Sequence, residues 1–528
     1  MTYFIFRNST IEPLFTDFNA IFSGYGDVTI GMSDVDYFIW FYLLDLKSDI
    51  DSLVDEIDDY YHKIELLLTK IPDSKPLIIF TIEKFNRSRL VNNDFILDEA
   101  IYNFNKKIFS LDVKYPNVKI IEISEFISKF RQNELIDWKF YYTSDIILNP
   151  KLKLYFNDWF TKKINAINFI RKKCIVLDLD NTLWGGILGE DNVEGILLGN
   201  TYPGSAYSDF QKLLLEIQKK GVILTVCSKN NKVDVDEAWE KNPFMILKKE
   251  HFSAFRINWK DKVSNILEIA DELNIGLDSM VFLDDDPSER ELVSKSIPEV
   301  IVPELPKQPY LLTDFLLNLY EQYFQVYQLT EEDKNKTQHY LAQKKGKEYK
   351  STFKSYDDYL RNLEIHTQIQ NASKFNIPRI AQLTQKTNQF NLTTKRYSEK
   401  NISDFVINNH FVACMTIKDK FGDYGITACA VVLINNDEAE IDTFLLSCRI
   451  LGKGYENVFI SGLLNELIDK GIKKVKAEFR QSNKNMQTEN FYDNFGFKLD
   501  SINNGIKNYH FIFGEKIIIK DLYNLEII

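Results

Sequence analysis

A short apolar run that ends abruptly in two acidic residues constrains the fold of this chain most strongly. Residues 174–177 (Cys-Ile-Val-Leu) are apolar without a break, which is typical of a strand buried on both faces of a parallel sheet. Asp178 and Asp180 follow two positions apart, so on an extended backbone their side chains point the same way. Gly185 and Gly186 then favour a sharp turn. The pattern predicts an α/β fold with two carboxylates at the carboxyl end of a strand, where open sheets bind ligands.

A second buried run and a helix start follow in the chain and suggest phosphate chemistry. The run at 222–227 ends at Ser228, whose hydroxyl could hold a phosphoryl oxygen. A helical pattern then begins near Lys262, and an amine at such a helix start can neutralise a transferring phosphoryl group. Lys260 is the alternative for this role.

The acidic residues also predict a metal site. A third buried run, 280–283, ends in Asp284 and Asp285, and carboxylates held this close need a cation or a proton between them. Mg²⁺ fits because it takes hard oxygen ligands and leaves room for phosphate oxygens. The expected metal ligands are the side chains of Asp178 and Asp284 and the backbone carbonyl of Asp180, with Asp285 in support.

The order of these signals resembles the haloacid dehalogenase (HAD) superfamily: D-x-D-x-T, then Ser, then Lys, then a hydrophobic run with Asp-Asp. On this reading Asp178 is the nucleophile that forms an aspartyl-phosphate, and Asp180 is the general acid and base. The insertion at 184–207 is short, which predicts a small cap and an open site. The residues expected to bind the phosphoryl group are Thr182, Ser228 and Lys262.

Length and composition limit the remaining possibilities. A chain of 528 residues should form two to four domains, and an apolar content of 45% is ample for their cores. The net charge of −12 argues against general nucleic-acid binding. The first residues lack the features of a signal peptide, and no apolar run reaches the length of a membrane span. Five cysteines without metal-type spacing indicate a reduced, cytoplasmic protein.

Residues 1–168 alternate strand and helix signals. The strands are expected at 37–44, 75–81 and 118–123, with helices at 49–69 and 92–109. This alternation predicts a βαβ sheet of flavodoxin-like or SGNH-hydrolase-like type. There is no Gly-Asp-Ser nucleophile turn and no Asp-x-x-His pair near residue 150, so we expect a non-catalytic docking domain rather than an active hydrolase.

The domain boundaries follow from breaker residues and charge. The HAD domain is expected over 169–307, where a proline-rich stretch marks its end. A helical pattern then leads into the basic stretch 344–350, which predicts a helical linker over 308–349. The third domain is expected over 350–528.

The third domain has its own signature. Strand patterns at 424–434 and 439–446, joined by a turn at 435–437, predict a hairpin. An R-x-x-G-x-G stretch then opens a helix, which is typical of a backbone nest for a pyrophosphate or phosphopantetheine. Together with F-Y-x-x-F-G-F at 491–497, this resembles the α+β fold of GNAT (Gcn5-related) acyltransferases. The expected pantetheine-binding residues are Arg449, Gly452 and Gly454.

Cys448 lies at the strand end directly before this nest. Arg449 and a helix N-terminus both lower a thiol pKa, so we interpret Cys448 as a reactive thiol. The alternative is a small buried core residue. The other cysteines are interpreted as core residues: Cys174, Cys227, Cys414 and Cys429.

Across nearly its whole length the chain resembles the FkbH-like proteins, in which a HAD-type phosphatase is fused to a GNAT-like glyceryl transferase domain. Asp286 departs from the family, which usually has Asn at that position. The matching stretches are 176–186, 228–231, 257–259, 282–290, 379–394, 421–425 and 447–449.

The resemblance implies a bifunctional glyceryl transferase and phosphatase of polyketide or glycan biosynthesis. Members take the glyceryl unit of 1,3-bisphosphoglycerate, remove its phosphate and load the acyl group onto an acyl carrier protein. By analogy Cys448 would carry phosphoglyceryl as a thioester, and Asp178 would remove the 3-phosphate. The nest would admit the phosphopantetheine of the carrier. Residues that could line the acyl site are Asn388, Asn391, Thr393 and Lys395.

Two other functions stay open. A HAD phosphatase with a GNAT-like domain could acylate an amino sugar of a surface glycan, and direct transfer of that kind needs no protein thiol. A non-enzymatic scaffold is the third possibility. The acidic residues of the predicted metal site argue against a scaffold.

Overall fold

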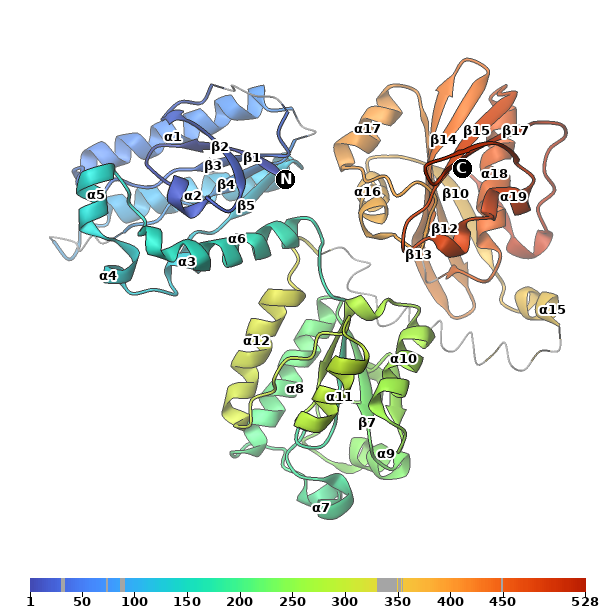
Figure 1. Cartoon of the computed structure of the whole chain (residues 1–528), viewed down its shortest axis with the longest axis horizontal. Coiled ribbons are helices and arrows are strands. Elements are labelled where there is room, and N and C mark those ends of the chain that lie inside the picture. The colour runs from blue at the N-terminus through green and yellow to red at the C-terminus, as the bar shows by residue number, and fades with distance from the viewer. Residues whose placement is uncertain are drawn as a thin grey trace. The chain divides into compact units, whose positions relative to one another are not determined.

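The structure is a computed structural model of the whole chain (Figure 1). It describes residues 1–29, 34–72, 75–85, 91–329, 349, 353, 355–447 and 450–528. The chain divides into two compact units, 1–167 and 168–528. Within the described residues, none of the helices combines the length and apolar character that crossing a membrane requires.

The first unit is built on a five-stranded parallel sheet. Its order is β2-β1-β3-β4-β5, the order of doubly wound sheets of flavodoxin type. The strands are β1 (Thr2–Arg7), β2 (Asn19–Tyr25), β3 (Tyr37–Phe41), β4 (Leu77–Phe80) and β5 (Val118–Ile121). The helices are α1 (Ile50–Lys70), α2 (Ile96–Lys114), α3 (Ser124–Ile127), α4 (Gln132–Leu135), α5 (Trp138–Ser144) and α6 (Lys153–Ile167), with 3-10 turns η1 (Glu12–Leu14) and η2 (Pro150–Leu152).

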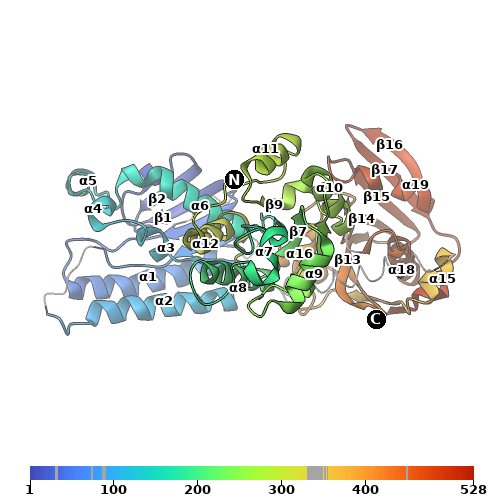
Figure 2. The ribbon, with the colours of Figure 1, turned by 90° about the horizontal axis from the view of Figure 1, so that it is seen from below.

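Apolar stripes on the helices cover both faces of this sheet. Helices α1 and α2 lie side by side on one face, where their buried residues pack against Phe38, Trp40 and Ile79 (Figure 2). Helix α6 packs on the other face in an aromatic core that includes Phe15 and Phe41. Because both faces are covered, the central strands β3 and β4 are continuous apolar runs rather than alternating ones.

The first unit lacks the histidine that a serine-hydrolase triad needs. Its one histidine, His62, lies on the exposed side of α1 and pairs with Glu65. The backbone amide of Thr10, just after β1, donates to the carbonyl of Asp145 at 3.1 Å, so this segment lies beside the strand end. An Asp-x-x-His pair that began at Asp145 would have its histidine at position 148, where the chain has the buried Leu148. The non-catalytic role of this unit and its SGNH-hydrolase-like fold both stay predictions.

The second unit begins with a four-stranded parallel sheet of order β8-β7-β6-β9. Its strands are β6 (Cys174–Leu177), β7 (Ile223–Ser228), β8 (Ala254–Ile257) and β9 (Met280–Leu283). The helices are α7 (Leu188–Gly195), α8 (Gly204–Lys219), α9 (Lys232–Lys241), α10 (Lys262–Leu273), α11 (Pro287–Ser296) and α12 (Leu312–Tyr323), with 3-10 turns η3 (Lys249–His251), η4 (Leu277–Ser279) and η5 (Pro309–Leu311).

Alternate residues of β6 enter different cores, which explains its uninterrupted apolar sequence. Ile175 and Leu177 pack with the buried residues of α8, α9 and α12. Cys174 and Val176 pack with those of α10 and α11. A strand covered on both faces must be apolar at every position.

Helix α12 belongs to this domain, although the sequence predicted residues 308–349 as a linker. Leu312, Leu316 and Leu319 are buried in the same core as α8. Their spacing places them on one face of the helix, and burying that face stabilises the domain. The basic part of the predicted linker, 344–348 and Lys350, lies outside the described residues.

The remainder of the second unit carries a nine-stranded mixed sheet. Eight strands follow the order β16-β17-β15-β14-β13-β12-β10-β18, and β11 pairs with β14. The strands are β10 (His366–Asn371), β11 (Phe390–Asn391), β12 (Phe411–Asp419), β13 (Gly422–Asn435), β14 (Glu438–Leu446), β15 (Lys474–Arg480), β16 (Lys498–Asn503), β17 (Ile506–Ile512) and β18 (Leu525–Ile527).

Helices cover both faces of this sheet as well. Buried residues of α18 pack on one face, and those of α16 and α17 pack on the other (Figure 1). The predicted hairpin is present as β13 and β14, which pair antiparallel. The helices are α15 (Tyr356–Arg361), α16 (Ile377–Lys386), α17 (Glu399–Ile407), α18 (Tyr455–Asp469) and α19 (Phe491–Phe495), with 3-10 turns η7 (Met486–Thr488) and η8 (Asp521–Tyr523).

We predict that Gly204→Ala destabilises the protein, although alanine is the better helix former. A Cβ at Gly204 would lie 2.8 Å from the backbone carbonyl carbon of Leu198, so backbone must move. The expected loss is about 1–3 kcal/mol in urea unfolding. Gly189→Ala in α7 is the matched control, because nothing lies within 4 Å of its added Cβ. A Gly204→Ala variant as stable as the control would contradict the packing described here.

Candidate functional site

Three carboxylates meet at one edge of the four-stranded sheet. Strands β6 and β9 pair in parallel with Leu177 opposite Leu283, and the amide of Asp178 donates to the carbonyl of Leu283 at 2.9 Å. Asp178 and Asp284 therefore follow neighbouring strands at the same level. An oxygen from each of Asp178, Asp284 and Asp285 lies within 4.8 Å of the other two. The first two are buried and Asp285 is exposed, so the cluster opens toward solvent on one side.

The amine that reaches this cluster is that of Lys262. Lys262 is the first residue of α10, whose N-cap Asp261 accepts from the amide of Ser264. Its Nζ lies 3.0 Å from Asp178 Oδ1 and also forms an ion pair with Asp284. Lys260, the alternative from the sequence, is exposed and pairs with Glu268 at 3.2 Å. The geometry therefore favours Lys262 for a phosphoryl-binding role.

Burial and charge act against each other in this cluster. Burial raises the pKa of Asp178 to about 7; Asp284 adds to the rise, while Lys262 and the hydroxyl of Ser228 oppose it. Burial alone would lower the pKa of Lys262, but Asp178 and Asp284 outweigh it and raise that pKa. Burial and Asp284 also raise the pKa of Asp285. The single positive charge of Lys262 therefore does not balance the negative charges that the three carboxylates can carry.

Asp180 lies apart from this cluster and is held by three donors. Its Oδ1 accepts from the indole Nε1 of Trp184 and from the amide of Leu188, each at 3.0 Å. Its Oδ2 accepts from the side-chain amide of Asn230 at 2.8 Å. Asp180 was expected to bind the metal through its backbone carbonyl, and that expectation stays a prediction, because the cluster is defined by side-chain oxygens only. These contacts favour its second expected role, in proton transfer.

Asn230 is the site residue that the sequence reasoning missed. Its Nδ2 also lies 3.2 Å from the Ser228 hydroxyl, so it connects Ser228 with Asp180. The available signal was its position two residues after Ser228 at a strand end, where side chains tend to point the same way.

Two buried hydroxyls lie on the segments that carry the acidic residues. Thr182 and Ser228 are both buried. Among the described residues, no hydrogen-bond partner is present for Thr182 Oγ1. An unsatisfied buried hydroxyl is costly, so a ligand oxygen bound there would be stabilised. This fits the expectation that Thr182 contributes to phosphoryl binding.

Asp286 has a structural role beside the cluster. Its side chain caps α11 by accepting from the amide of Ser288 at 2.8 Å, and its own amide donates to Asp284 Oδ1 at 2.9 Å. Arg290 donates to the carbonyls of Asp284 and Asp285 at 2.8 and 2.7 Å. These bonds fix the turn that presents the two carboxylates.

The predicted nest of the third domain is described only in part. Cys448 and Arg449 lie outside the described residues. Gly452 and Gly454 have φ values of +81° and +80°, and Gly454 is the N-cap of α18. A left-handed backbone at both glycines explains why the turn needs them. A Cβ on Gly454 would also lie 2.5 Å from the hydroxyl of Tyr523.

Strand β14 changes partners along its length. It pairs with β15 only over 438–441, and further along Leu445 and Leu446 pair with Asn391 and Phe390 of β11. The amide of Leu392 donates to the carbonyl of Phe444, and the amide of Arg480 donates to the carbonyl of Leu392. Residues 390–392 thus lie between the separating ends of β14 and β15.

The residues expected to line an acyl site bond mainly within the protein. Asn391 is buried, donates to the carbonyl of Thr387 and accepts from the amide of Thr394. Thr393 is buried and donates to the carbonyl of Asp442 at 2.9 Å. Lys395 pairs with the same Asp442 at 2.5 Å, and Asn388 accepts from Arg396. These contacts anchor the segment that carries β11.

The four cysteines expected in cores are buried. Burial raises the pKa of the Cys174, Cys227 and Cys414 thiols to about 12 and also raises that of Cys429. These four thiols are therefore unreactive at neutral pH.

Comparison with known proteins supports the architecture of part of the chain. No family model and no curated protein matches it. Among solved structures it is similar to the N-terminal part of the protein BF1531 from Bacteroides fragilis, described as containing a phosphatase domain complexed with Mg. The identity is 28%, the match covers 62% of this chain and 95% of that chain, and the TM-score is 0.53.

Two further matches are acetyltransferases. The ribosomal-protein-S18-alanine N-acetyltransferase from Escherichia coli is 16% identical over 29% of this chain and 99% of its own, with a TM-score of 0.23. The GNAT domain of PAT from S. lividans is 14% identical over 28% of this chain and 89% of its own, also with a TM-score of 0.23. TM-scores this low carry no argument about the activity of the third domain.

We predict that, in the metal-free protein, the stability contributed by Asp178 falls as the pH rises from about 4 to about 8. The pKa of Asp178 is higher in the folded protein than in the unfolded chain, so the folded state binds more protons in this range and loses stability as they leave. Thermal unfolding with EDTA against pH measures this. Mg²⁺ should stabilise the protein increasingly as the pH rises, by about 2.7 kcal/mol at a hundredfold excess over Kd.

Two variants control that measurement. Asp284→Asn should abolish the stabilisation by Mg²⁺, because it removes a clustered carboxylate. Asp286→Asn should keep it, because asparagine can still cap α11. Equal stabilisation of both variants would rule out the carboxylate cluster as the binding site.

Proposed function

We propose that this chain is a phosphatase that acts through an aspartyl-phosphate, fused to an acyl transferase domain. The observation that carries the proposal is the cluster of Asp178, Asp284 and Asp285 around the amine of Lys262 at the edge shared by β6 and β9. Buried like charges are destabilising, so such a cluster is typical of a functional site. The likeness to a phosphatase-containing protein supports the same reading.

The arrangement fits a bound divalent cation. Three carboxylate oxygens within 4.8 Å of one another are hard ligands of the kind that Mg²⁺ takes, and the exposed side of Asp285 leaves room for substrate and water. Asp178, Asp284 and Asp285 would hold the ion. When bound, Mg²⁺ would neutralise negative charge on the phosphoryl oxygens.

The residues of the chain supply the chemical steps. A carboxylate oxygen of Asp178 attacks phosphorus while the bond to the leaving oxygen breaks, and Asp180 gives that oxygen its proton. Asp180 then takes a proton from the water that attacks the aspartyl-phosphate and releases phosphate. Trp184 and Asn230 orient Asp180 for both transfers. Lys262, Ser228 and Thr182 would bind the phosphoryl oxygens.

The finer proposal follows the resemblance to FkbH-like proteins. The substrate would be 1,3-bisphosphoglycerate, Cys448 would carry the phosphoglyceryl group, and the phosphopantetheine of an acyl carrier protein would receive the glyceryl group. The left-handed Gly452 and Gly454 before α18 support a nest for that cofactor arm. The hairpin β13–β14 in front of it supports a GNAT-like domain.

We predict that Asp178→Asn lowers phosphate release from a chromogenic phosphomonoester by at least about a thousandfold, because an amide cannot act as the nucleophile. Steady-state phosphate release measures this, with circular dichroism to check the fold. EDTA should abolish the activity and Mg²⁺ should restore it.

A lysine pair tests the assignment of the phosphoryl-binding amine. Lys262→Met should lose activity, whereas Lys260→Met should retain it, because Lys260 pairs with Glu268 outside the cluster. Unchanged phosphate release in Asp178→Asn, or equal effects of the two lysine variants, would refute the proposed site.

We predict that the wild-type protein forms a covalent adduct with 1,3-bisphosphoglycerate generated in situ, and that Cys448→Ala does not. Intact-mass spectrometry measures the adduct, and Cys414→Ala is the matched control because Cys414 is buried in a core. An adduct in the wild type and in Cys414→Ala, but not in Cys448→Ala, supports 1,3-bisphosphoglycerate as the donor, Cys448 as the acceptor and a covalent intermediate. If no variant forms an adduct while phosphatase activity persists, the glyceryl-transfer proposal fails and the amino-sugar acyltransferase replaces it.

A further inference from the structure

Helix α2 has an exposed apolar stripe in addition to the one it buries. Tyr102, Phe109 and Val113 are 64%, 43% and 88% exposed. Together with Lys106 they follow a spacing of four, three and four residues, which places them along one face of the helix. Its buried stripe comprises Leu97, Ile101, Phe104, Ile108 and Leu111. A solvent-facing stripe of this kind is typical of a surface that contacts another protein.

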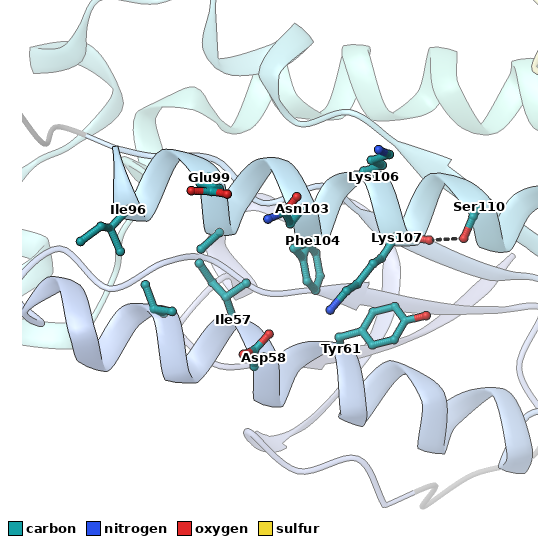
Figure 3. Close-up of a pocket in the computed structure, with 12 residues that line it drawn as sticks. Ile57, Asp58, Tyr61, Ile96, Glu99, Asn103, Phe104, Lys106, Lys107 and Ser110 are labelled. Atoms are coloured by element: carbon teal, nitrogen blue, oxygen red, sulfur yellow. Dashed lines mark hydrogen bonds between the residues drawn. The ribbon is translucent and has the colours of Figure 1, made fainter. Parts of the chain in front are cut away.

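A groove of about 630 Å³ runs between α1 and α2 beside this stripe (Figure 3). Its charges are divided along its length. Glu99 lies toward the Ile96 end, and Lys107 lies toward the Ser110 end (Figure 3). The groove therefore has a negatively charged residue at one end and a positively charged residue at the other.

Two charged side chains of this face, Glu99 and Lys106, lie outside the ion pairs that anchor α2. Helix α2 pairs with the rest of the domain through Asp98 with Lys84 and Asp112 with Lys119. In the described part of the chain, Glu99 and Lys106 form no ion pair. They lie seven residues apart, which is about 10 Å along a helix.

The order of charged and apolar residues along α2 is complementary to that of a second copy of the helix that runs antiparallel to it. If α2 lies antiparallel against α2 of another molecule with the axis between positions 102 and 103, Glu99 of each copy faces Lys106 of the other. The same register places Ile96, which is 56% exposed, opposite Phe109. One arrangement therefore pairs the charges and places Ile96 against Phe109. A partner with charge of a single sign would satisfy only one end.

We propose that the α1–α2 face of the first unit binds the same face of a second copy, which forms a twofold symmetric dimer. In such an interface each contact occurs twice, because the same patch is used on both molecules. The pair Glu99 with Lys106 occurs once on each side of the axis. The residues of this surface belong to neither the proposed phosphatase site nor the proposed transferase site, so the proposal adds an assembly function to the first unit.

Charge reversal in the full-length protein tests the proposal. Sedimentation equilibrium over a roughly hundredfold concentration range should show a wild-type dimer. Glu99→Lys alone and Lys106→Glu alone should each weaken association at least about tenfold, because each places like charges opposite one another. The double variant Glu99→Lys/Lys106→Glu should restore the dimer, because it exchanges the two charges.

Glu237→Lys on α9 is the control, since Glu237 is partly exposed, pairs with Lys241 of its own helix and belongs to the other unit; the change should leave association unchanged. Circular dichroism checks that each variant is folded. A wild-type protein that stays monomeric throughout the range would overturn the proposal. A dimer that resists both single reversals, or one that the double reversal does not restore, would equally overturn it.

Discussion

The arrangement of the candidate site depends on one buried ammonium placed between two buried carboxylates. Lys262 contacts both Asp178 and Asp284, which would otherwise face each other as unbalanced like charges. Three independent features bring them together: the parallel pairing of β6 with β9, the abrupt end of both apolar runs, and the start of α10. The remaining excess of negative charge explains why a divalent cation would be stabilised there.

The structure separates two aspartates that lie only two positions apart in the chain. Asp178 lies in the charged cluster, whereas Asp180 accepts from Trp184, Leu188 and Asn230. The first environment suits a nucleophile close to a cation, and the second holds a carboxylate in a fixed orientation for proton transfer. This division of roles comes from neighbours supplied by α7 and by the segment after β7.

In the nine-stranded sheet of the second unit, a segment of the chain itself occupies the space between the ends of β14 and β15. Residues 390–392 bond to both sides, and Asp442 accepts from Tyr397 at 2.5 Å in the same network. The side chains of Asn391 and Thr393 are used in these bonds. In the proposed transfer reaction these two residues therefore support the shape of the domain, while the glycine turn before α18 remains the candidate for the cofactor arm.

The sequence alone determined the elements whose signals are local. Strands β6 and β9 were predicted to the residue, because an uninterrupted apolar run that ends in charge marks a doubly buried strand. The same residues indicated the carboxylate cluster. Strands β1 and β2 were not predicted, and α12 was interpreted as a linker, because an apolar stripe does not reveal which core will bury it. Only the tertiary structure distinguished Lys262 from Lys260 and placed Asn230 beside Asp180, because hydrogen bonds and ion pairs between distant segments depend on how those segments pack.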